Sequence, residues 1–147
     1  MAYQAKRKAS YQEEFQLVEA DGTVVHTLHV ALDADSVVRR LGEKHLALVH
    51  ALHSVQSIQK DNSPEELTKG LDVLGGAVVD LLEAVFGEAD TKTIVDFYDN
   101  RYVEMCQEVV PFITEVVIPQ VRKISQENKK SVLHQYNRKA RRSFGKK

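Results

Sequence analysis

The sequence predicts a mainly α-helical (α+β) protein, in which an N-terminal β-hairpin precedes a bundle of three to five helices with a proline-kinked C-terminal helix. Two patterns predict this class: apolar residues alternate with polar ones before residue 31, and they recur at spacings of three and four from residue 38 onward. We expect a flexible N-terminus over residues 1–12, one domain over 13–135 and a basic, disordered tail over 136–147. A chain of 147 residues with 43% hydrophobic content suits one domain with its own core.

The hairpin is predicted over residues 13–31. Its two arms flank Asp21-Gly22, which is a strong signal for a two-residue turn. The alternating apolar residues are Phe15, Leu17, Val24, Leu28 and Val30. Because an isolated hairpin is marginally stable in water, we expect it to pack on helices or to pair with the edge of another chain.

A first amphipathic helix is predicted to begin after Asp33 or Asp35, either of which is a suitable N-cap, and to end near Gln59. Its apolar stripe is Val38, Leu41, His45, Leu48, Leu52 and Val55.

A second helix is predicted to begin at Pro64, because Ser63 and Glu66 form a capping box around it. Its stripe is Leu67, Leu71, Leu74, Val78, Leu81 and Val85. Gly87 is placed to end it, and the Gly75-Gly76 pair within it favours close approach of another backbone over a bend in the helix.

A third helix is predicted to begin at Asp90 as its cap and to continue to Val109. Its apolar side is Ile94, Phe97, Tyr98, Tyr102, Met105 and Val109. The stretch "VVPFITEVVIPQV" then places two prolines in an apolar run that is too short for a membrane span and unsuited to a central strand. We read it as a helix with a break near Val109, Pro111 in a new first turn and a kink at Pro119.

The net charge of −1 conceals a strong segregation. Residues 61–108 carry twelve acidic and three basic side chains, a balance of −9, whereas residues 122–147 carry ten basic and one acidic, a balance of +9. This asymmetry predicts either attraction within or between subunits, or a basic arm aimed at an acidic partner.

No pattern predicts catalysis, a metal site or a cofactor. His50 and His53 share a helix turn without a third ligand, and Cys106 has no histidine near it in sequence. With one cysteine and no signal-peptide pattern, we expect a soluble, cytoplasmic protein that is not an enzyme.

Three stretches resemble the tail assembly chaperones of long-tailed, non-contractile bacteriophages. They are "LDADSVVRRLGEKHLAL", "LLEAVFGEADTKTIVDFYDNRYVEM" and "PFITEVVIPQVR", and the resemblance covers roughly residues 28–142. It implies a helical late protein, made from the gene just ahead of the tape-measure protein. Such a protein coats the tape-measure protein, keeps it soluble, recruits major tail tube subunits in the host cytoplasm and is absent from the mature virion.

The expected partner surface is aromatic, since aromatic residues are enriched at binding cores. Its candidate residues are Phe97, Tyr98, Tyr102, Phe112 and Ile113, each of which is individually more typical of the protein's own core. The basic tail has two interpretations: docking on an acidic protein surface, of which this chain has one of its own, or binding nucleic acid. Its residues are Arg138, Lys139, Arg141, Arg142, Lys146 and Lys147.

Overall fold

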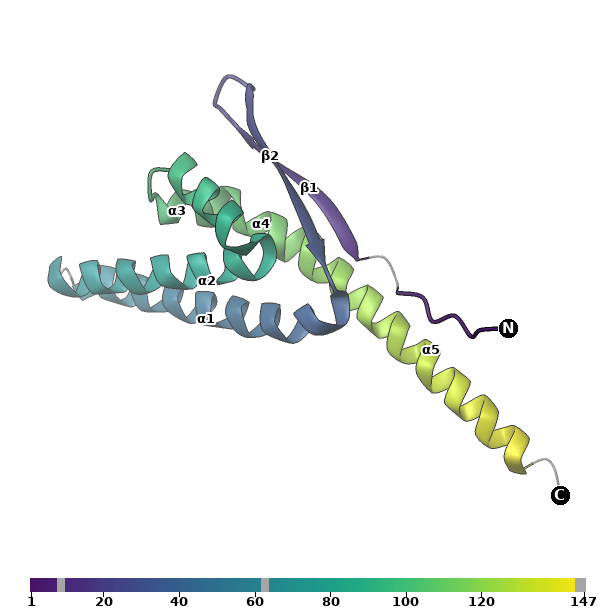
Figure 1. Ribbon diagram of the computed structural model, residues 1–147. Helices are drawn as coiled ribbons and strands as arrows, with labels where there is room; N and C mark the ends of the chain where they lie inside the picture. The colour runs from purple at the N-terminus through teal and green to yellow at the C-terminus, as the bar shows by residue number, and fades with distance from the viewer. Residues whose placement is uncertain (8–9, 62–63, 145–147) are drawn as a thin grey trace.

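The computed structural model describes residues 1–7, 10–61 and 64–144, and their side chains except those of 58–61 and 138–144. Most of these residues are helical, and a two-stranded antiparallel sheet precedes the helices (Figure 1). The predicted mainly α class with an N-terminal hairpin is therefore confirmed. Ser63 of the predicted capping box lies outside the described residues, but α2 does begin at Pro64.

The hairpin joins β1 (Tyr11–Val18) to β2 (Val24–Leu32), with Phe15 opposite Leu28. The prediction of a two-residue turn at Asp21-Gly22 is wrong. The Gly22 N–H donates to the Glu19 carbonyl and the Glu19 N–H donates to the Thr23 carbonyl, both at 2.9 Å, so that Ala20 and Asp21 are the central pair. Gly22 follows this turn at φ +93°, a backbone conformation that glycine adopts without steric cost.

One face of the hairpin packs against the helices. Its buried residues are Leu17, Leu28, Val30 and Leu32. Phe15 extends this face into an aromatic cluster, in which its ring centroid lies 5.3 Å from that of Phe86 and 4.8 Å from that of Phe112. Val24, predicted on the same face, is exposed because the hairpin tip extends past the helices (Figure 1).

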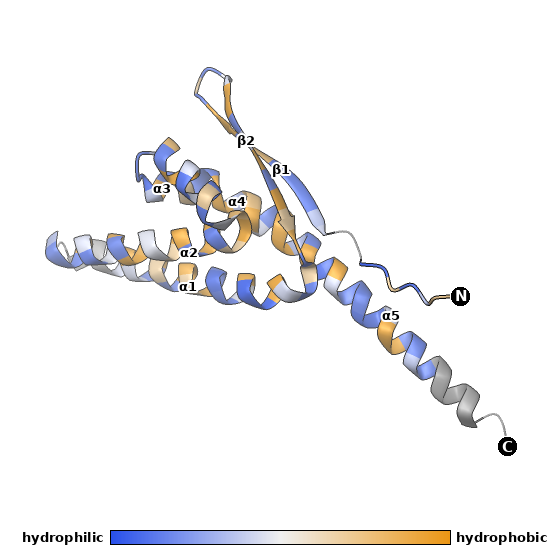
Figure 2. Cartoon of the chain, in the orientation of Figure 1, coloured by the Kyte–Doolittle hydropathy of each residue, from blue (hydrophilic) through white to orange (hydrophobic). Residues whose placement is uncertain are grey.

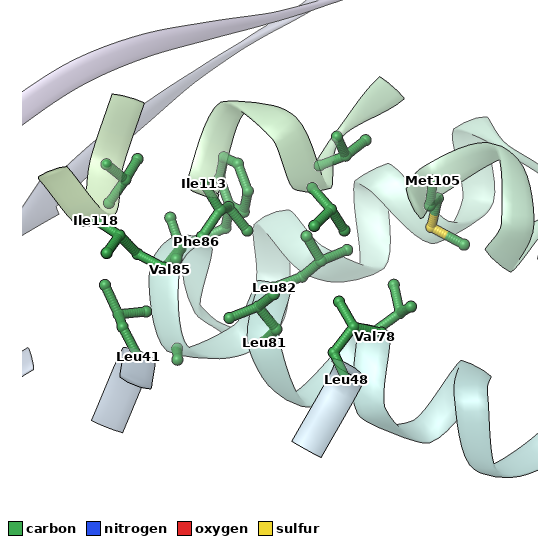
Figure 3. Packing of buried hydrophobic residues seen from close by; sticks show 14 of the residues in the cluster. Leu41, Leu48, Val78, Leu81, Leu82, Val85, Phe86, Met105, Ile113 and Ile118 are labelled. Atoms are coloured by element: carbon green, nitrogen blue, oxygen red, sulfur yellow. The ribbon is translucent and has the colours of Figure 1, made fainter. Parts of the chain in front are cut away.

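The core lies between α1 (Ala34–Asp61), α2 (Pro64–Phe97) and the C-terminal helices. Figure 3 shows Leu41 and Leu48 of α1 facing Val78, Leu81 and Leu82 of α2. Both predicted stripes face the core for most of their length, with Val38, His45 and Leu67 half-buried and one exposed residue in each stripe. Leu52 and Leu71 are exposed, and Ala51 takes the buried position next to Leu52.

Gly87 interrupts α2 at φ +81° and ψ 170°, so the predicted break at this residue is confirmed. The helical segment beyond it ends at Phe97 and does not reach Val109 as predicted. Asp99 and Asn100 follow at φ +50° and +61° and turn the chain before α3 (Tyr102–Glu108) begins. Asp and Asn are the non-glycine residues that enter this left-handed region most readily. Asp90 therefore lies in the first turn after Gly87 and not at a helix cap.

The C-terminal half of the fold is a bent helical path. A short break at Val109 separates α3 from α4 (Val110–Phe112), and Pro111 lies in the first turn of α4, as predicted. A π-helical turn, η1 (Ile113–Val117), then leads into α5 (Ile118–Phe144). The bend brings α5 past α1 and beyond the rest of the molecule, and its helical backbone extends into the segment predicted to be disordered (Figure 1).

Candidate protein-binding surface

The predicted aromatic surface does not form an exposed patch. Ile113 is fully buried, and the Phe112 ring lies against Phe15 and Phe86 beneath the hairpin. This part of the predicted surface joins the hairpin to the helices.

The other three predicted residues gather where α2 ends and α3 begins. The rings of Phe97 and Tyr98 pack edge to face with centroids 5.0 Å apart, and both side chains are half-buried against the core. Tyr102 packs on α2, where a Cβ atom added to Gly75 comes within 2.8 Å of its ring. The structure thus divides the five residues between two places and gives each of them neighbours inside the chain.

An exposed apolar surface lies on α5. Its buried side follows helical spacing through Ile118, Val121 and Ser125. The same spacing continues to Val132 and Tyr136, yet Val132 is 65% exposed and Tyr136 is 72% exposed. With Leu133, which is 60% exposed, these two residues form what we call the α5 stripe.

The α5 stripe is exposed because α5 extends beyond the start of its neighbour, α1. The α1 helix begins at Ala34, and the hydrogen bond from the Asn128 side chain to the Asp35 carboxylate, at 3.1 Å, marks where α5 passes that start. Beyond it, α5 projects away from the other helices, and hydrophobic residues continue along the projecting part (Figure 2). A helix that is apolar on one side and unpaired there is a typical docking element.

A groove lies beside the stripe, between the start of α1 and the middle of α5. Its volume is about 580 Å³. The lining residues are Asp35, Val38, Arg39, Ser125, Asn128, Lys129, Val132 and Leu133. The groove and the stripe therefore form one continuous apolar surface with charged residues at its rim.

The acidic and basic segments of the chain are not joined by ion pairs among the described side chains. Among the described side chains, the ion pairs are Arg39–Glu43, Lys44–Asp80 and Arg101–Glu104, and the His29 imidazole lies 3.8 Å from the Glu14 carboxylate. None of them joins the acidic residues 61–108 to the basic residues 122–137. Within the described part of one subunit, no ion pair supports the predicted attraction between these segments.

Metal binding and thiol chemistry have no support among the described residues. The described residues contain no cluster of three or more histidine, cysteine or carboxylate side chains that could hold a metal ion. Burial raises the pKa of the half-buried Cys106 thiol, which disfavours the nucleophilic thiolate. Burial also raises the pKa of the Tyr98 hydroxyl, and the carboxylates of Glu108 and Glu104 add to that shift.

The side chains of the predicted basic tail lie outside the described residues. This applies to Arg138, Lys139, Arg141 and Arg142 of α5 and to Lys146 and Lys147 after it. Within the described part of α5, the side chains of Arg122, Lys123, Lys129 and Lys130 are exposed. The described part of α5 is therefore basic before the tail begins.

Sequence reasoning did not identify the α5 stripe as a binding surface. The signal was present, since Val121, Ser125, Val132 and Tyr136 maintain helical spacing. The spacing does not show where the neighbouring helix, α1, stops covering α5. Exposure of the stripe follows from the relative lengths and placement of α1 and α5.

Comparisons with known proteins provide no family assignment: a scan against protein-family models and searches of curated proteins and of solved structures each returned no match. No helix among the described residues is long and apolar enough to cross a membrane. Support for a function therefore comes from the residues and surfaces of the chain itself.

Proposed function

We propose that this protein is a tail assembly chaperone of a long-tailed bacteriophage, acting by reversible protein binding in the host cytoplasm and not by catalysis. It binds helical segments of the tape-measure protein, keeps that protein soluble and helps to recruit tail tube subunits. The observation that carries the proposal is the α5 stripe, Val132, Leu133 and Tyr136, which is open to solvent beside an apolar groove. The resemblance of three sequence stretches to that family supports the choice of client.

The docking mode follows from the shape of this surface. An amphipathic helix presents apolar residues every three or four positions and fits an open apolar groove along its length. The groove begins at Val38 and Ser125 and is continuous with Val132 and Leu133, so a client helix lying along α5 contacts both. Burying three large side chains that are now exposed provides a favourable apolar contribution of several kcal/mol, on the order of 1.5–3 kcal/mol for each.

Co-expression with the tape-measure protein encoded next to this chain tests the proposal. The wild-type chain is expected to increase the soluble yield of the tape-measure protein and to co-purify with it. Substituting Val132→Asp and Tyr136→Asp is expected to abolish both effects, because two carboxylates cannot be buried unpaired under a client helix.

A matched control carries the same charge on the other sides of the helix. Ser131→Asp and His134→Asp add two carboxylates at exposed positions off the stripe and are expected to leave the yield unchanged. An unchanged yield of soluble tape-measure protein with the wild-type chain contradicts the proposal. Equal loss in both variants assigns the effect to net charge and contradicts docking on the stripe.

In this proposal, the bundle of three to five helices presents α5 through a hinge that Pro119 sets. Proline lacks the N–H that the fourth preceding carbonyl, that of Glu115, normally accepts from, and its ring crowds that turn. The π-helical turn Ile113–Val117 lies directly before it and offers the wider spacing that relieves this crowding. Pro119→Ala is expected to straighten the path, and an unchanged bend in a crystal structure of that variant refutes the role of proline.

Nucleic acid is a second candidate partner, favoured by the exposed basic side chains of Lys129 and Lys130 on the projecting part of α5. In that case binding to RNA or DNA falls steeply with salt, and a chain ending at Gln135, which retains Lys129 and Lys130 but lacks the six basic residues of the tail, binds much more weakly. The absence of any shift of RNA or DNA at low salt excludes this candidate.

A further inference from the structure

The α5 stripe and the acidic side of α2 are complementary surfaces, and no ion pair among the described side chains brings them together within one subunit. We propose that the projecting part of α5 docks on the acidic face of α2 in a second copy of this chain, and that two copies do so reciprocally. The inference goes beyond the proposed function, because it requires no client and concerns the protein alone.

The acidic face of α2 is defined by Asp72, Val73, Gly76, Asp80 and Glu83. Spacings of three and four place these residues on one side of the helix, and all five are exposed. Val73 is 61% exposed and provides an apolar contact in the middle of the carboxylates. The face is acidic at its rim and apolar at its centre.

Gly76 is the feature of this face that one subunit leaves unexplained. A glycine inside a helix costs about 1 kcal/mol relative to alanine. Its neighbour Gly75 is required by the Tyr102 ring, but a Cβ atom at Gly76 meets nothing within 4 Å. A helix of a second copy that crosses here can approach the α2 backbone closely, which is a common reason for a glycine in mid-helix.

The projecting part of α5 has the complementary character. Its stripe is apolar at Val132 and Tyr136, and Lys129 and Lys130 are exposed beside it. Residues 122–147 carry a balance of +9 and residues 61–108 a balance of −9. Opposite charge around an apolar contact both steers association and sets the register of the partners.

The same charges argue against other ways of covering the stripe with this chain. Pairing α5 with α5 of a second copy brings together two segments that each carry a balance of +9. Docking of α5 on α2 within one subunit is opposed by the fold, because α5 packs mainly along α1 and η1 and then projects away (Figure 1). A reciprocal pair uses both surfaces of both copies and closes with twofold symmetry.

Sedimentation of the purified full-length chain tests the inference. At about 50 mM salt the chain is expected to form dimers whose dissociation constant rises at least about tenfold at about 500 mM salt, since the contacts are exposed charges. Two charge-reversal variants, K129E/K130E and D72K/E83K, are each expected to weaken the dimer by a similar factor. All four positions are exposed, so the monomer keeps its fold, which circular dichroism verifies.

Mixing the two variants provides the decisive measurement. In the mixture, the acidic α5 of K129E/K130E meets the basic α2 face of D72K/E83K. At the other contact, the unchanged α5 of D72K/E83K meets the unchanged α2 face of K129E/K130E. A heterodimer as tight as the wild-type dimer is therefore expected. A mixture that remains monomeric, or a wild-type chain that is monomeric at low salt, overturns the inference.

Gly76→Leu provides an uncharged variant of the same test. The monomer has open space at this position, so the variant is expected to fold and to lose dimer affinity at least about tenfold, because the side chain holds the partner helix away from the backbone. A dimer that tolerates Leu at Gly76 and both charge reversals uses another interface, and this result also overturns the inference.

Discussion

Gly75 and Gly76 are adjacent in α2, and the structure predicts opposite outcomes for the same alanine substitution. A Cβ atom at Gly75 lies 2.8 and 2.9 Å from two ring carbons of Tyr102, whereas one at Gly76 meets nothing within 4 Å. Both substitutions gain about 1 kcal/mol from helix propensity and reduced freedom of the unfolded chain. Only Gly75→Ala also overpacks the contact with Tyr102, which lowers the free energy of unfolding by about 1–3 kcal/mol.

We therefore expect Gly76→Ala to raise the free energy of unfolding by about 0.5–1 kcal/mol, which is a rise of roughly 1–4 °C in Tm for a domain of this size. Gly75→Ala is expected to lower it by up to about 2 kcal/mol, the overpacking cost less the helix gain. Urea and thermal unfolding followed by circular dichroism measure both. High salt and dilute protein keep the chain monomeric, so that the proposed dimer does not contribute.

Tyr102 provides the control for this pair. In a Tyr102→Ala background the clash is absent, and Gly75→Ala is expected to stabilise as much as Gly76→Ala does. Such a double-mutant cycle isolates the contact between the two positions. If Gly75→Ala stabilises the chain that retains Tyr102, the close packing of α3 on α2 is refuted.

Three further predictions concern the hairpin and the single thiol. Burial, together with the Glu13 carboxylate, raises the pKa of Tyr11 from 10.0 to about 12, so the folded chain keeps this proton after the unfolded chain has lost it. The free energy of unfolding is therefore expected to fall as pH rises between about 10 and 12. Urea unfolding of wild type and Tyr11→Phe over this pH range isolates the contribution of Tyr11. The same pH dependence in both chains refutes the raised pKa. Phe15→Ala is expected to cost about 2–3 kcal/mol by removing its contacts with the Phe86 and Phe112 rings, whereas Val25→Ala at the exposed tip stays within about 0.5 kcal/mol. Cys106, whose pKa burial raises, is expected to react slowly with a thiol reagent in the native chain and rapidly in denaturant; equal rates refute its burial.

Local periodicity predicted the fold class because it records which side of each element is apolar. The stripes of α1 and α2 are examples, since Leu41, Leu48, Val78 and Leu81 are all buried. It did not predict the break at Asp99 and Asn100, because the apolar spacing continues across that turn as if the helix were intact. The left-handed backbone conformation of Asp99 and Asn100 leaves no sign in the spacing of apolar side chains.

The candidate site was harder to predict for a related reason. Aromatic residues favour binding surfaces and cores alike, and here Phe112 and Tyr102 are held by neighbours within the chain. Val132 and Tyr136 have the same spacing as buried residues of α5 and differ from them only because α1 begins too late to cover them. Whether a stripe is core or surface is therefore decided by the arrangement of helices and not by the stripe.

The proposed client and the proposed second copy require the same stripe, and this overlap has a thermodynamic consequence. Each occupant excludes the other, so the apparent affinity for client is lowered by the fraction of chains held in dimers. Salt weakens the dimer through its charged rim but affects an apolar client contact much less. Raising salt from about 50 to 500 mM is therefore expected to strengthen apparent client binding by the wild-type chain while leaving binding by K129E/K130E nearly constant, and this direction distinguishes competition at one stripe from two independent surfaces.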